Sequence, residues 1–81
     1  MMPEEQLFKT EDVHTRSEIA QTLTAAAEQI ESGTVELTSA TQEQSVSIPD
    51  EPTLEVELER LTDSETGEQR YELEYELRWT E

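Results

Sequence analysis

The chain has 81 residues, 32% of them hydrophobic, and a formal net charge of −16 from 21 acidic and 5 basic residues. This length allows one domain at most, and a domain of this size is close to marginal stability. The excess of carboxylates repels nucleic-acid backbones and anionic membranes, so we expect neither as a partner.

The kind of charge indicates adaptation to salt. Lys9 is the only lysine, and cysteine is absent, which excludes disulfides and thiolate metal sites. At molar salt the Debye length is only ~3 Å, so neighbouring carboxylates repel each other weakly. Low hydrophobicity with high charge is also typical of intrinsic disorder. The periodic patterns described next favour a folded, halophilic domain.

The N-terminal part is the least regular. Residues 1–6 are an acidic tail with neither a basic region nor an apolar stretch, so we expect no secretory signal. No run approaches the ~18 apolar residues of a membrane span, and we expect a cytoplasmic protein. We assign residues 7–81 to a single domain. Its first segment, Leu7 to Val13, is either an edge strand or an extended arm that leads into a helix.

A helix is predicted over residues 16–32. Thr15 and Glu18 have the spacing of a capping box, in which each side chain bonds the backbone amide of the other residue. Gly33 supplies a left-handed stop. Between these signals, apolar side chains recur on one helical face. That face consists of Ile19, Leu23, Ala26, Ala27 and Ile30.

Two short strands follow the helix. Residues 34–39 and 45–49 alternate between apolar and polar side chains, and polar residues 40–44 between them suit a hairpin connection. Residues 49–52 then form a turn that Pro52 makes stiff.

The most regular alternation lies in residues 53–61 and 71–79, which we predict to be the two strands of a hairpin. Gly67 lies in the loop between them, where a positive φ is needed. Pairing the apolar faces sets glutamates opposite or diagonal to one another, whereas a slip by one residue would bury them. The predicted polar face is therefore a ladder of carboxylates: Glu55, Glu57, Glu59, Glu72, Glu74 and Glu76.

These elements predict an α+β fold with one helix packed on an antiparallel sheet of four strands, or of five if residues 7–13 join at the edge. The expected core is Ile19, Leu23, Ala27, Ile30, Val35, Leu37, Val46, Ile48, Leu54, Val56, Leu58, Leu73, Tyr75, Leu77 and Trp79.

The order and spacing of these segments resemble a known family. The matching segments are Thr15–Glu18, Glu31–Gly33, Val35–Leu37, Val46–Pro49, Leu54–Leu58 and the last strand, which ends at Trp79. Over about residues 7–80 the chain resembles the amphi-Trp domain proteins of halophilic archaea and some bacteria, a family named for its terminal amphipathic, tryptophan-bearing strand. The resemblance implies a small domain with a helix on an antiparallel sheet. It implies no activity and no functional residues.

No catalytic constellation is present, so we do not expect an enzyme or a cofactor. His14 is the only histidine, and Ser17 is too near in sequence to be a persuasive nucleophile for a triad. We interpret His14 as a partly exposed residue before the helix cap. No zinc or di-iron spacing exists. The abundant carboxylates could hold a hard cation loosely, and the loop from Asp63 to Glu68 faintly resembles a calcium loop, but we expect no specific metal site.

An interaction role is the leading hypothesis. A single helix of about 17 residues is only about 25 Å long and cannot cover a broad sheet. We therefore name Tyr71, Tyr75 and Trp79 as a candidate interface for a homo-oligomer. Free sheet edges offer a second route to association.

Two other functions stay open. The acidic face could bind basic protein surfaces, and the chain could be a weak cation- or small-ligand-binding domain. Arg60, Arg70 and Arg78, all on the predicted hairpin, could form a small positive spot.

Overall fold

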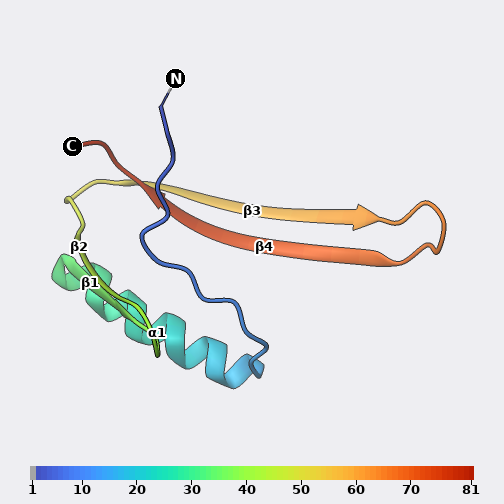
Figure 1. Cartoon of the computed structure of the whole chain (residues 1–81), viewed down its shortest axis with the longest axis horizontal. Helices are drawn as coiled ribbons and strands as arrows, with labels where there is room; N and C mark the ends of the chain where they lie inside the picture. The colour runs from blue at the N-terminus through green and yellow to red at the C-terminus, as the bar shows by residue number, and fades with distance from the viewer. Residues whose placement is uncertain (1) are drawn as a thin grey trace. The chain divides into compact units, whose positions relative to one another are not determined.

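In the computed structural model, which describes residues 2–81, one helix precedes four strands (Figure 1). The strands form two antiparallel sheets of two strands each, β1–β2 and β3–β4. The α+β class is as predicted, but the single sheet of four or five strands is not what these residues form. The elements are α1 (Arg16–Ser32), β1 (Thr34–Thr38), β2 (Glu43–Ser47), β3 (Thr53–Thr62) and β4 (Gln69–Arg78).

Local interactions set both ends of α1, and its bounds coincide with the predicted ones. The amide of Glu18 donates to Thr15 Oγ1 at 3.1 Å, and the amide of Thr15 donates to Glu18 Oε1 at 2.9 Å, which completes the capping box. At the other end, Gly33 has φ 95° and donates its amide to the carbonyls of Gln29 and Ile30. A left-handed residue without a Cβ therefore ends the helix.

The sheet β1–β2 is attached to the end of α1. Val35 pairs with Val46 in this ladder. The Gln29 side chain accepts the amide of Glu36 at 2.9 Å, and the Gly33 carbonyl accepts the amide of Ile48 at 2.9 Å. These two bonds hold the small sheet beside the C-terminal part of the helix, and α1 contacts β1.

Residues 7–13 do not form the possible fifth strand. They are an extended arm, the other option that the sequence allowed. Lys9 and Gln42 connect this arm to the turn between β1 and β2, through the Lys9 amide to Gln42 Oε1 at 3.4 Å and Gln42 Nε2 to the Lys9 carbonyl at 3.1 Å. Only side-chain atoms of Gln42 take part, so no backbone ladder continues the sheet.

The strands β3 and β4 form a long hairpin that closes through a turn at residues 63–68 (Figure 1). Asp63 Oδ1 accepts the amides of Glu65 at 2.8 Å and Thr66 at 3.2 Å. Gly67 has φ 76°, which confirms the need for glycine there. The Asp63 side chain thus organises the turn, as aspartate commonly does.

The chain divides into two units, Met1–Ile48 and Pro49–Glu81, and each is described by itself. No residue from 2 to 81 is buried, so the expected core is wrong as a set of buried side chains. The side chains stay exposed because each unit has too few layers to cover them. The first has one helix beside a two-stranded sheet, and the second is a hairpin without another layer of its own. Neither encloses enough side chains to exclude water.

Candidate interaction surface

The register of the hairpin separates its side chains into two chemically different faces. Leu54 pairs with Leu77, and Val56 pairs with Tyr75. Because side chains alternate along each strand, every second position shares a face. We call one set the apolar face: Leu54, Val56, Leu58, Tyr71, Leu73, Tyr75 and Leu77. This register matches the two apolar faces, as the alternation predicted, and it places the glutamates directly opposite one another rather than diagonally.

Most of the apolar face is open to solvent. Leu58 is 68% exposed and Val56 is 55% exposed, although their alternation predicts that both are in the core. The tyrosines of the candidate interface, Tyr71 and Tyr75, are 60% and 61% exposed. Contiguous exposed apolar surface of this kind marks an interaction site or a face that needs cover.

Trp79 has a different environment from the two tyrosines. It is half-buried and lies one residue beyond the end of β4. Exposed aliphatic side chains of β3 and β4, such as Leu54, Leu58 and Leu73, lie beside the two tyrosines on the same face.

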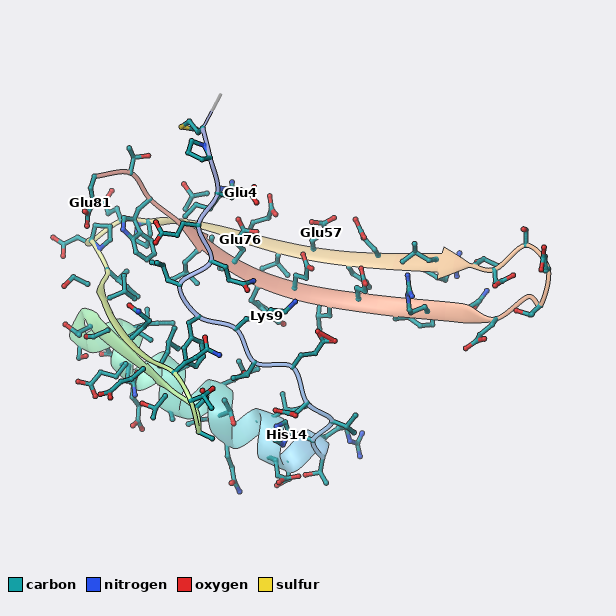
Figure 2. The ribbon with its side chains drawn as sticks, viewed as in Figure 1. Glu4, Lys9, His14, Glu57, Glu76 and Glu81 are labelled. Atoms are coloured by element: carbon teal, nitrogen blue, oxygen red, sulfur yellow. The ribbon has the colours of Figure 1, made fainter. Side chains whose placement is uncertain are left out.

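The opposite face carries the carboxylate ladder, from which Glu57 and Glu76 project in Figure 2. Its six glutamates form three directly opposed pairs: Glu55 with Glu76, Glu57 with Glu74, and Glu59 with Glu72. A hydrogen bond with the Glu59 carboxyl, followed by the negative charge of Glu59, raises the pKa of Glu57 to about 7. Like charges crowded on one face favour the protonated form of a carboxyl group.

Arg78 relieves the crowding at one end of the ladder. Its Nη1 lies 3.0 Å from Glu55 Oε1 and 3.5 Å from Glu76 Oε1. The Glu55 carboxylate raises the pKa of Arg78. Because all three side chains are partly exposed, such pairs contribute little to stability, and the main effect is local neutralisation.

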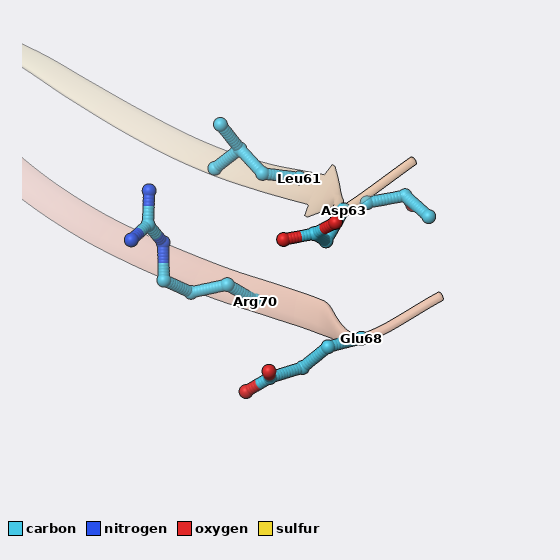
Figure 3. A pocket seen from close by; sticks show the side chains of 5 residues that line it. Leu61, Asp63, Glu68 and Arg70 are labelled. Atoms are coloured by element: carbon cyan, nitrogen blue, oxygen red, sulfur yellow. The ribbon is translucent and has the colours of Figure 1, made fainter. Parts of the chain in front are cut away.

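The three arginines do not form a positive spot. Arg60 pairs with Tyr71 at the end of the apolar face, Arg70 pairs with Leu61 near the turn, and Arg78 ends β4. Arg70 lines a cavity of about 260 Å³ together with Leu61, Thr62, Asp63 and Glu68. Figure 3 shows these residues where β3 and β4 meet the turn. The two carboxylates beside Arg70 make this cavity a poor anion site.

The other candidates for chemistry do not converge. His14 directly precedes the Thr15 cap and is partly exposed, as predicted, with Nδ1 4.0 Å from Glu18 Oε2. Within residues 2–81, no group of three or more His, Cys, Asp or Glu side chains is arranged to hold a metal ion. The hairpin, with one apolar and one acidic face, is the most distinctive surface of the described chain.

No helix within residues 2–81 has the length and apolar character needed to cross a membrane. No curated protein and no solved structure matches the sequence. The profile of the Amphi-Trp domain matches residues 2–81, which is nearly the whole chain and includes both the capped helix and the two-faced hairpin. The chain therefore belongs to the Amphi-Trp domain family.

Proposed function

We propose that this protein is a non-enzymatic interaction module that associates with itself and works at high salt in the cytoplasm. The observation that carries the proposal is the exposed apolar face of the β3–β4 hairpin. An isolated two-stranded hairpin is at best marginally stable in water, and it needs further strands or another layer on its apolar side. A second copy can supply that layer.

A rival arrangement covers the same face within one chain. In that arrangement the apolar side of α1 packs on the apolar face of the β3–β4 hairpin. A chain folded in that way has no need of a second copy and stays monomeric. The number of copies in solution therefore distinguishes the two arrangements.

The test is sedimentation equilibrium in ~2 M KCl, where screening is strong. We expect a dimer or a larger species. Leu58→Ala removes a side chain from the apolar face, and Glu59→Ala is the matched control from the opposite face of the same strand. Because burying a leucine side chain contributes about 1.5–3 kcal/mol, Leu58→Ala should weaken association roughly tenfold or more. Glu59→Ala should not weaken it. A monomeric wild-type chain would contradict the proposal.

A second candidate function rests on the carboxylate ladder. Three opposed glutamate pairs and a net charge of −16 support binding to a basic protein surface. Contacts of this type weaken as salt rises, so the two functions have opposite salt dependences. If affinity pull-down from a lysate at native salt recovers no basic partner, this second function is wrong.

A further inference from the structure

We propose that the apolar face of the hairpin stacks on the same face of a second copy of this chain, with the two hairpins running in opposite directions. This inference rests on the self-association proposed above and specifies its geometry. It commits to a face-to-face contact between sheets and not to pairing along a strand edge.

The size of the apolar face suits such a contact. Six of its side chains are 55–68% exposed: Leu54, Val56, Leu58, Tyr71, Leu73 and Tyr75. A standard stable interface buries ~800 Å² per partner. Aromatic side chains bury about 150–250 Å² each, so the two tyrosines and the four aliphatic side chains beside them can supply a large share of that area. Leu77 and the residues at the rim extend this area. One hairpin face can therefore supply most of a dimer interface.

The distribution of charge favours a face-to-face contact over an edge contact. No carboxylate lies on the apolar face, and the ladder occupies the reverse side of both strands. Stacked sheets lie about 10 Å apart, so the two ladders end on opposite outer surfaces, farther apart than the Debye length of ~3 Å at molar salt. Edge pairing would instead continue the rows of glutamates across the seam, where like charges repel.

The direction of the second hairpin follows from Arg60. The register places Arg60 on the same side of the hairpin as the apolar face, at the end near the turn. Among the paired residues of β3 and β4, it is the single charged side chain on that side. In a two-fold arrangement with parallel hairpins, the two Arg60 side chains would meet. With antiparallel hairpins they lie at opposite ends of the interface. The centre is then apolar and lies between the Val56–Tyr75 and Leu58–Leu73 pairs.

Thiol protection tests this geometry, because the natural chain has no cysteine. We would compare two single-cysteine variants, Val56→Cys at the centre of the apolar face and Glu57→Cys on the opposite side of the same strand. The rate of maleimide alkylation is measured for each at concentrations below and above the dimer Kd. At ten times Kd, mass action leaves about one chain in five monomeric, so alkylation of Cys at position 56 should slow roughly fivefold. The rate at position 57 should not change.

Sedimentation of the same two variants separates the possible failures. If the chains associate but neither thiol is protected, the face-to-face geometry is wrong while self-association stands. Protection at position 56 that does not depend on concentration would show that the chain covers its own apolar face, which overturns the second copy as occupant. A monomer at every concentration overturns the proposed function as well.

Discussion

Glu57 shows how the ladder changes the chemistry of a single side chain. It lies on β3 between Glu55 and Glu59, with Glu74 directly opposite. Its carboxyl shares a hydrogen bond with Glu59, and the nearby negative charges add to this effect, so its pKa rises to about 7 from an ordinary 4.5. Between these two values the folded hairpin holds a proton that the unfolded chain releases.

Because of this proton, we expect the free energy of unfolding of the hairpin to depend on pH. Protonated Glu57 contributes to the stability of the folded state, and this contribution is fully present below pH 4.5. It is lost as the pH rises through about 7, because between the two pKa values the folded state binds a proton that the unfolded chain does not. We expect the thermal midpoint of the wild-type hairpin to fall between pH 5 and pH 8. Glu57→Gln should flatten this dependence, because an amide stays neutral throughout.

Circular dichroism melts over this pH range check the prediction, together with an NMR titration of the Glu57 carboxyl carbon. Glu28→Gln on α1 is the control, because it removes one negative charge outside the hairpin. If Glu28→Gln flattened the profile as much as Glu57→Gln, overall charge and not the local cluster would be the cause.

At the scale of the element, α1 owes its ends to local chemistry. The reciprocal bonds of Thr15 and Glu18 satisfy two backbone donors at the start of the helix. The hydrogen bond between the Glu18 carboxylate and the Thr15 amide also lowers the pKa of Glu18. The cap thus persists over the neutral pH range.

Removal of the cap should destabilise the first unit. We expect Thr15→Ala to lower the free energy of unfolding by about 1 kcal/mol, the typical cost of losing an N-cap side chain. Urea unfolding followed at 222 nm in molar KCl measures this change. Thr22→Ala is the matched control, because the Thr22 hydroxyl donates to the Glu18 carbonyl within the helix and caps nothing. Equal losses in both variants would show that the cap is not the cause.

For the whole molecule, apolar attraction and charge repulsion have opposite effects. Each chain carries a net charge of −16, which opposes the approach of a second copy until salt screens it. The open apolar face favours association at any salt concentration. High salt therefore shifts the balance towards the assembled state.

This balance predicts that self-association strengthens as salt rises. Sedimentation equilibrium is compared at ~0.2 M and ~2 M KCl, because charges are strongly screened only at concentrations on the order of 1 M or more. The Kd for self-association should be smaller at the higher salt concentration. Glu28→Lys reduces the net negative charge without touching the hairpin, and it should lessen the difference between the two conditions. A Kd that increased with salt would instead indicate association through opposite charges.

The local features of this chain could be predicted from its sequence. The capping box and Gly33 set the bounds of α1. The alternation of residues 53–61 and 71–79 located both strands to within two residues at each end and showed which side chains share a face. A shift by one residue would exchange leucines for glutamates on the apolar face, so the alternation excludes odd shifts, and the tight turn at residues 63–68 selects among the remaining registers. These signals act over a few residues, or between strands joined by a tight turn.

The layering of the elements could not be predicted in the same way. Apolar periodicity identifies Leu58 and Val56 as members of one face, but it does not say what covers that face. Only the tertiary structure showed that β1–β2 and β3–β4 are separate sheets, that residues 7–13 form an arm, and that these side chains are exposed. Burial depends on contacts between segments far apart in the chain, or on a second chain, and no local pattern encodes these contacts.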